Sequence, residues 1–453
     1  MKEMQIKIYE NSPLFIQNSL VTFEGIRRLN KRYSKTYATF KHELEMRDYS
    51  DLQEEIRFQE KEMQKLIRHA VSNSPFYRKF YEGIDIEEIK TVDDLKKLPL
   101  LCKETVRKNI DAMYTVDENS AIVSLTSGTS GKAMKFLYTV ADMQKRMAHL
   151  DFFKKQHGFI NLKMKRASFS DQRFIPKRRG EGVYWRNNIF NKQRLYSAVY
   201  CQPAYAESIA KNLNEFKPLS LDGMPSAIYE IAKWINDHNI KLTFKPVAIF
   251  TTAENLYPYY RKEIEKAFGC KVRDQYASSE GAPFIAECTE GKLHYNLTTG
   301  VIEVAEDGEI FVTCFNTYGT PLIRYAIGDS IEFAKEQESC TCGSVHPVVQ
   351  KVHGRTNDYL QSKNKEKFTA LHLSLINEQL AGVVKNMQFK QNKMGFITVL
   401  VEADEQYTAS IGEIIEDEIE YLLGEEIEMD IQVVDKIPRG SNNKFRMIIN
   451  ELV

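Results

Sequence analysis

The sequence predicts an α/β protein with a large N-terminal domain of mixed and parallel sheets and a small α+β C-terminal domain. Three observations support this prediction. A charged helical segment leads the chain, and short β-like runs then alternate with helical stretches from residue 123 onward. After residues 353–355 the sequence restarts with its own strands and helix. We therefore expect a helical extension over residues 1–90, a core over 91–357 and a C-terminal domain over 358–453.

The helical extension places apolar residues at helical spacing among many charges. Residues 12–40, for example, mix Leu, Ile, Val, Phe and Tyr with Arg and Lys. Amphipathic helices of this kind usually pack on a protein core, so we expect the extension to cover the large domain. The alternative is that its surface attaches to a membrane or to a partner protein.

The two domains differ in their predicted elements. In the core, β-like runs such as AIVSL, PVAIFTT and EIFVTCF alternate with helical stretches such as SAIYEIAKWINDH and YPYYRKEIEKAF. This alternation is typical of α/β architecture with parallel sheet. In the C-terminal region, FITVLVE and IEMDIQVV are expected to be strands and SIGEIIEDEIEYLLG a helix.

The composition argues against several classes of protein. The 453 residues include 62 basic and 62 acidic side chains, so there is no net charge to attract nucleic acid, and we expect no nucleic-acid partner. The start of the sequence lacks the features of a secretory signal, and no apolar run is long enough to cross a bilayer. The 7 cysteines are an odd number in a long chain, which disfavours a disulfide framework. We expect a cytoplasmic protein.

A loop rich in Gly, Ser and Thr follows the β-like run AIVSL. Its backbone N–H groups and hydroxyls could surround the oxygens of a polyphosphate, to which Lys132 would add a positive charge. It is not a Walker A loop, because Thr126 stands where that motif needs glycine and Ala133 follows the lysine. Taken alone, the run fits an ordinary surface loop equally well. The predicted phosphate-binding residues are Thr126, Ser127, Gly128, Thr129, Ser130, Gly131 and Lys132.

The loop TSGTSGK resembles the phosphate-binding loop of the adenylate-forming superfamily, which contains acyl-CoA ligases, adenylation domains and luciferases. Four later segments resemble further motifs of that superfamily in the same order: YASSE at 276–280, YAIGD at 325–329, GRTND at 354–358 and PRGSNNKFR at 438–446. The runs NSPFYR, PLIRY and CTCG resemble the phenylacetate-CoA ligase and CapK-like branch, whose CapK-like members are associated with surface polysaccharide biosynthesis. The sequence departs from the pattern at Ala133, Met134 and Asn443.

The resemblance implies that ATP and Mg²⁺ convert a carboxylic acid into an acyl-adenylate with release of pyrophosphate. Among residues outside the loop, Glu280 would bind Mg²⁺, while Tyr276 and Glu254 would border the adenine. Asp329 would accept hydrogen bonds from the ribose hydroxyls, and Arg355 would bridge ribose and phosphate.

The resemblance also assigns two residues near and within the C-terminal domain. Lys444 would contact the carboxylate and the ribose or α-phosphate oxygens. Asp358 would be the hinge about which a mobile C-terminal domain rotates between the two half-reactions. On composition alone, Lys444 would be a solvated loop lysine, Asp358 a plain linker residue and Glu280 a surface carboxylate.

Two pairs of residues form a candidate zinc site. Cys288 and His294 make one pair, and Cys340 and Cys342 make the other. Four such ligands are typical of a tetrahedral structural zinc site, with His346 as a reserve ligand. The alternative is reduced thiols without a metal. The remaining cysteines lie in or near apolar runs and are expected in the core: Cys102, Cys201, Cys270 and Cys314.

Three functions fit the sequence. The first is an AMP-forming acid–CoA ligase that acts on a small carboxylic acid. The second transfers the activated acyl group to an amine on a sugar or amino acid. The third is a non-catalytic nucleotide-binding relative. The acid pocket is expected between about Tyr196 and Phe284, and the resemblance suggests a homodimer.

Overall fold

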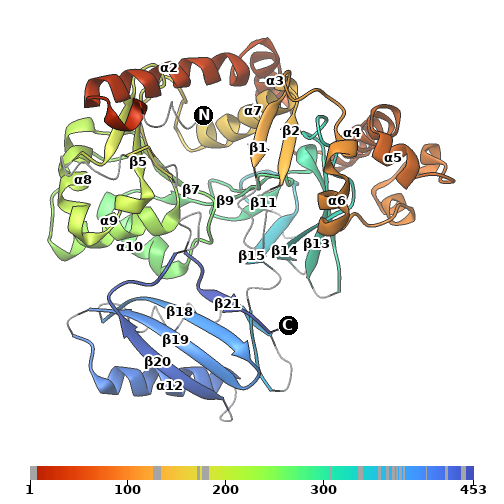
Figure 1. Ribbon diagram of the computed structural model, residues 1–453. Coiled ribbons are helices and arrows are strands. Elements are labelled where there is room, and N and C mark those ends of the chain that lie inside the picture. Colours follow the sequence, from red (N-terminus) through yellow and green to blue (C-terminus); the bar gives the residue numbers. More distant parts are fainter. Residues whose placement is uncertain are drawn as a thin grey trace.

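The computed structural model shows a large part, drawn in red through cyan, and a small blue C-terminal part (Figure 1). Within the residues that it describes, no helix has the length and apolar character needed to cross a membrane. The described residues are 8–125, 134–170, 174–175, 183–306, 308–334, 340–355, 359–363, 367–369, 373, 376, 380, 383–404, 406–423, 427–439 and 445–452.

The N-terminal segment is helical, as predicted, and it contacts the large domain directly. Helix α2 (Leu14–Arg32) lies along strand β4 (Trp185–Asn188), where Thr22 Oγ1 donates to the carbonyl of Asn187 at 3.2 Å. Some apolar side chains of this helix remain uncovered, since Phe15 and Phe23 are each 68% exposed. Contact of this surface with a membrane or a partner stays a prediction, as do the domain boundaries.

Helix α4 (Leu52–Asn73) illustrates how the sequence determines where a helix begins and which of its faces is buried. It begins at Asp51, whose carboxylate accepts the backbone N–H groups of Gln53 and Glu54 and so caps the helix. Its apolar side chains recur at helical spacing and are buried in the core of the antiparallel sheet region. The other helical elements of this segment are α3 (Lys35–Met46), α5 (Pro75–Phe80), η1 (Ile86–Glu88), η2 (Val92–Lys97) and α6 (Lys103–Met113).

A six-stranded sheet has the strand order β4-β5-β3-β6-β7-β8. All neighbours are parallel except the edge pair β4–β5. Strand β7 (Ala248–Thr251) is buried along its whole length, as expected for a parallel strand covered on both faces. The other elements around this sheet are α7 (Val140–Gln156), β3 (Arg166–Ser170), β5 (Gln193–Ser197), η3 (Ala198–Tyr200), α8 (Pro203–Phe216), β6 (Ser220–Gly223), α9 (Pro225–Asp237), α10 (Pro258–Phe268) and β8 (Val272–Arg273).

A seven-stranded antiparallel sheet, with the order β12-β13-β14-β15-β11-β10-β9, completes the large domain. The predicted mixture of sheets is therefore confirmed. Its elements, with the separate hairpin β1–β2, are β1 (Ile122–Leu125), β2 (Lys135–Tyr138), β9 (Gln275–Tyr276), β10 (Ile285–Glu287), β11 (Leu293–Tyr295), η4 (Leu297–Thr299), β12 (Gly300–Val304), β13 (Glu309–Cys314), β14 (Tyr325–Phe333) and β15 (Val348–Arg355).

The C-terminal domain is an α+β unit, as predicted. Its four-stranded sheet has the order β20-β19-β18-β21, and the predicted strands and helix correspond to β19, β20 and α12. Figure 1 shows this domain beneath the part of the large domain that carries α9 and α10. Its elements are β16 (Tyr359–Gln361), β17 (Lys367–Thr369), β18 (Val384–Lys393), β19 (Phe396–Ala403), α12 (Ala409–Leu423), β20 (Glu428–Val434) and β21 (Ile448–Asn450).

One hydrophobic core continues from the large domain into the C-terminal domain. It joins buried side chains of α9 and α10, such as Tyr229 and Tyr260, to those of β18, such as Met387 and Phe389. Polar groups cross the same boundary, because the hydroxyl of Tyr260 donates to Asn386 Oδ1 at 3.1 Å. The two domains therefore meet through a mixed apolar and hydrogen-bonded contact.

Candidate active site and metal centre

Strands of the antiparallel sheet bring together three of the residues expected to bind the nucleotide. Tyr276 ends β9, and its hydroxyl donates a hydrogen bond of 2.7 Å to Oδ2 of Asp329 on β14. Asp329 is 7% exposed and lies opposite Arg355 in the pairing of β14 with β15. Of Arg355, only the backbone is described. A buried carboxylate fixed in this way can accept hydrogen bonds from a diol.

Glu280, the expected Mg²⁺ ligand, is 4% exposed and lies in the turn after β9. Two side chains fix this turn. Arg146 on α7 donates to the carbonyl of Ser278 at 2.9 Å and to the hydroxyl of Tyr138 at 2.6 Å. Tyr138, at the end of β2, in turn donates to the carbonyl of Ser279 at 2.6 Å. The backbone directly before Glu280 is thus held by groups from β2 and α7.

The predicted phosphate loop starts beside the same turn. Ser124 on β1, two residues before the loop, donates from Oγ to the carbonyl of Ser279 at 3.3 Å. Sequence reasoning missed Tyr138 and Arg146, which belong to no motif. Tyr138 lies on the strand and Arg146 on the helix that follow the loop, and this proximity along the chain was the available signal.

Glu254 makes hydrogen bonds that join distant parts of the chain. Its Oε2 accepts the backbone N–H of Ser226 at 3.1 Å, and its Oε1 accepts the backbone N–H of Phe445 at 2.9 Å. Ser226 belongs to α9 of the large domain, whereas Phe445 belongs to the C-terminal domain. The predicted proximity of Glu254 to adenine stays a prediction.

Several predicted site residues lie outside the described part of the chain. These are the phosphate loop Thr126–Lys132, the hinge residue Asp358 and the catalytic lysine Lys444. Their assigned roles therefore rest on the motifs alone. The described neighbours of the loop and of Lys444 nevertheless show where these segments start and end.

The four predicted zinc ligands come together in space. One ligand atom from each residue lies within 4.8 Å of the others: Cys288, His294, Cys340 and Cys342. The two sulfurs of Cys288 and Cys340 are 3.8 Å apart, and Nε2 of His294 is 3.5 Å from the sulfur of Cys342. A tetrahedral Zn²⁺ with Zn–S bonds of about 2.3 Å and a Zn–N bond of about 2.0 Å separates such atoms by about 3.8 and 3.5 Å. The residues therefore fit zinc.

The surroundings of His294 favour the tautomer that a metal requires. Its Nδ1 lies 2.8 Å from the backbone carbonyl of His346, so Nδ1 carries the proton and the lone pair of Nε2 faces Cys342. Burial lowers the pKa of His294, which keeps the imidazole neutral, although its hydrogen bond to His346 acts in the opposite direction.

His346 serves this site as a supporting residue, and its side chain is outside the group of four ligands. Its Nε2 pairs with Oε2 of Glu55 at 2.8 Å. Glu55 is fully buried and also pairs with Arg47. The expected reserve ligand therefore orients His294 through its carbonyl, while the contact with buried Glu55 fixes its ring.

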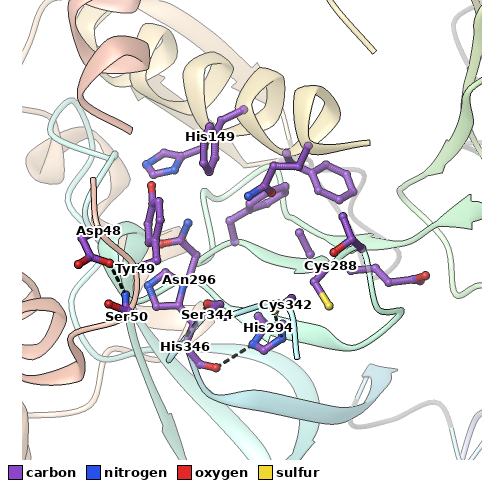
Figure 2. A pocket seen from close by; sticks show the side chains of 18 residues that line it. Asp48, Tyr49, Ser50, His149, Cys288, His294, Asn296, Cys342, Ser344 and His346 are labelled. Atoms are coloured by element: carbon purple, nitrogen blue, oxygen red, sulfur yellow. Dashed lines mark hydrogen bonds between the residues drawn. The ribbon is translucent and has the colours of Figure 1, made fainter. Parts of the chain in front are cut away.

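A cavity of about 240 Å³ opens beside the metal-ligand group (Figure 2). Helix α7 contributes His149, which is 4% exposed. Neither ring nitrogen of His149 has a hydrogen-bond partner among the described residues. Burial lowers its pKa to about 3, so the ring is neutral. Figure 2 shows His149 across the cavity from His294 and Cys288.

Comparison with known proteins identifies the family. Protein CapK of Staphylococcus aureus is 36% identical over 451 residues, which cover 98% of this chain and 99% of that protein. The chain belongs to the CapK family. The family description of the CapK C-terminal domain matches residues 360–451.

Two further comparisons extend this CapK relationship. A phenylacetate-coenzyme A ligase of Thermus thermophilus is 23% identical, covering 80% of this chain and 84% of that enzyme. The crystal structure of 2-hydroxyisobutyryl-CoA ligase in the postadenylation state has a TM-score of 0.72 at 17% identity, covering 89% of this chain and 91% of that one. The predicted fold and the predicted place in the CapK-like branch of the adenylate-forming superfamily are confirmed.

Proposed function

We propose that this CapK-family chain activates a small carboxylic acid with ATP and transfers the acyl group to CoA. The observation that carries the proposal is the convergence of Glu280, Asp329 and the start of the phosphate loop. Asp329 is fixed by Tyr276, and Ser124, two residues before the predicted loop, donates to the turn of Glu280. A carboxylate for a metal, a carboxylate for a ribose and a phosphate loop are the groups that adenylate formation needs.

In the first half-reaction, a carboxylate oxygen of the acid attacks the α-phosphorus of ATP, and the bond to the pyrophosphate oxygen breaks. Negative charge develops on the phosphates, so the site needs positive potential at fixed positions. The loop 126–132 would bind the β and γ phosphates, and Arg355 would contact the ribose and phosphate. Mg²⁺ on Glu280 would neutralise phosphate charge. Asp329 would orient the ribose, and Tyr276 would keep that carboxylate in place.

Lys444 would contact the acid and the α-phosphate during this step. In the second half-reaction, the thiolate of CoA attacks the acyl carbonyl and AMP leaves with the electrons of the broken bond. Rotation of the C-terminal domain about Asp358 would withdraw Lys444 and admit the thiol. The acyl-CoA ligase relatives support CoA as the acceptor.

We also propose that the metal-ligand group binds one structural Zn²⁺. The ligand spacing and the His346 carbonyl support this assignment. Four protein ligands would fill the tetrahedral shell and leave no open position for a substrate. The zinc would then join the loop after β10, strand β11 and the segment before β15 within one domain.

The test is pyrophosphate release from ATP and Mg²⁺ with a panel of carboxylic acids, with and without CoA. Lys444→Ala is compared with wild type, and Lys393→Ala, an exposed lysine on β18, is the matched control. We expect acid-dependent release that falls by about 10²–10³-fold in Lys444→Ala, because one group that stabilises the transition-state charge is lost. The Lys393→Ala protein should match wild type.

The acceptor is tested in the same experiment. Acyl-CoA formation that requires CoA supports the proposal, whereas an amide formed with an amine supports the amine ligase instead. A folded protein that binds ATP and releases no pyrophosphate with any acid would favour the non-catalytic nucleotide-binding relative, and one that fails to bind ATP would exclude all three functions.

A further inference from the structure

The two residues that flank the segment 440–444 both contact one small surface of the large domain. Before the segment, Arg439 donates from a guanidinium nitrogen to the hydroxyl of Ser226 at 2.8 Å. After it, the backbone N–H of Phe445 donates to Glu254 Oε1 at 2.9 Å. We call the set Ser226, Glu254, Arg439 and Phe445 the docking contact.

The large-domain half of the docking contact is built as a unit. Ser226 is fully buried in the first turn of α9, and its backbone N–H donates to Glu254 Oε2 at 3.1 Å. One carboxylate therefore fixes the start of α9 with one oxygen and reaches the C-terminal domain with the other. An ordinary helix cap would need only the first of these bonds.

The backbone before Glu254 is strained. Strand β7 ends at Thr251, and Ala253 then adopts a φ of +75°, in the left-handed region that side chains with a Cβ disfavour. Such strain persists where the surrounding structure imposes it, often at functional positions. Here it turns the chain directly before the carboxylate that contacts both domains.

We propose that Glu254 is a positioning residue for adenylation: together with Ser226 it fixes both ends of the segment that carries Lys444. The inference rests on the proposed function, which assigns Lys444 to the first half-reaction. Because Arg439 and Phe445 belong to the C-terminal domain, the docking contact stabilises the domain orientation in which Lys444 is delivered. It must break when the domain rotates for acyl transfer, and a small number of hydrogen bonds can do so reversibly.

The chemistry of the contact requires a carboxylate. Both partners of Glu254 are N–H donors, and an ionised carboxylate offers only acceptors. A glutamine would present its NH₂ group to one of the two donors. Glu254→Gln therefore breaks one side of the contact while it preserves the length and shape of the side chain.

The experiment measures domain orientation and catalysis separately. Spin labels are placed at Lys211 on α8 and Asp417 on α12, both exposed, through keto amino acids that spare the native cysteines. Their distance distribution is recorded with and without a non-hydrolysable ATP analogue for wild type and Glu254→Gln. The matched control is Glu263→Gln, a carboxylate of α10 that pairs with Asn236 inside the large domain.

We expect Glu254→Gln to reduce the ratio of docked to undocked protein about tenfold, because it loses a hydrogen bond to a charged group. The kcat of pyrophosphate release should fall by about 10- to 100-fold, since misplacement of a catalytic group is that costly. The dissociation constant of ATP should stay within about twofold of wild type, as expected for a residue that acts through another. Glu263→Gln should change neither quantity.

Two results would overturn the inference. An unchanged distance distribution in Glu254→Gln would show that the contact does not control domain orientation. Weaker ATP binding with an unchanged distribution and kcat would instead make Glu254 an adenine contact. If Glu254→Gln does not fold, Ser226→Ala and Arg439→Ala each remove the other hydrogen bond of the docking contact, between Arg439 and the Ser226 hydroxyl, and should shift the distance distribution in the same direction. The distances need no carboxylic acid, so they remain informative even if no acid supports pyrophosphate release.

Discussion

The metal-ligand group and the docking contact both join segments far apart in the sequence, yet they do so by opposite means. The metal-ligand group gathers four side chains within one domain, and one of them, His294, is oriented by the carbonyl of His346, whose ring contacts buried Glu55. The docking contact connects two domains through a few hydrogen bonds. Metal bonds suit a permanent connection, whereas single hydrogen bonds suit one that forms and breaks in each catalytic cycle.

The domain boundary also contains a buried carboxyl group with a raised pKa. Glu230 on α9 is 7% exposed and accepts a hydrogen bond from Asn386 of the C-terminal domain at 3.4 Å. Burial raises its pKa to about 7, and the nearby Glu402 adds to this, while Arg439 and Lys436 lower it. Glu230 therefore predicts that docking depends on pH.

The largest effect is expected from breaking the metal site. Cys340→Ser should abolish stoichiometric zinc and destabilise the large domain by about 3–5 kcal/mol, because metal binding contributes directly to folding. Zinc content by elemental analysis and the melting temperature check this. Cys102 precedes helix α6 and is exposed, so the expectation that it lies in the core is wrong. Cys102→Ser is therefore the control and should retain zinc. A Cys340→Ser protein with full zinc and unchanged melting would contradict the assignment.

A smaller effect is expected from the domain boundary. In the docked state, the pKa of Glu230 is raised from 4.5 to about 7. Between these two pH values, the docked protein therefore binds more protons at Glu230 than the undocked protein does. Docking is therefore strongest below about pH 4.5 and weakens as the pH rises through about 7. The free energy of docking changes by at most about 3 kcal/mol over this range. Glu230→Gln, which is neutral throughout, should remove this dependence and strengthen docking at pH 8.

The spin-label distances described above, measured from pH 5 to 8, check the Glu230 prediction. Wild type should lose docked population across this range, and Glu230→Gln should not. Parallel pH profiles for the two proteins would mean that Glu230 does not titrate with docking.

The smallest effect is expected from the support of the metal ligands. Glu55→Gln weakens the hydrogen bond that holds the His346 ring. We expect it to lower the zinc affinity about tenfold, which is typical for residues that support a metal ligand. Competition with a chelator measures this, and exposed Glu54→Gln is the matched control. Equal affinity in both variants would mean that the Glu55 pair stabilises the fold without tuning the metal.

Sequence patterns predicted much of this molecule because they reflect local physics. The alternation of strands and helices gave the α/β core, and the second series of strands gave the C-terminal domain. The spacing of Cys288, His294, Cys340 and Cys342 indicated the metal-ligand group, since thiolate and imidazole are the usual ligands of structural zinc. The motifs likewise pointed to Tyr276, the turn of Glu280 and Asp329.

The sequence by itself determined which side chains carry the chemistry, because carboxylates, thiols, imidazoles and ammonium groups differ from one residue type to another. Only the tertiary structure decided how these groups are held. His294 is oriented by the carbonyl of His346, and Glu254 contacts the N–H groups of Ser226 and Phe445. Every residue other than proline carries the same backbone N–H and C=O, so no sequence pattern distinguishes the few that act in a site from all the others.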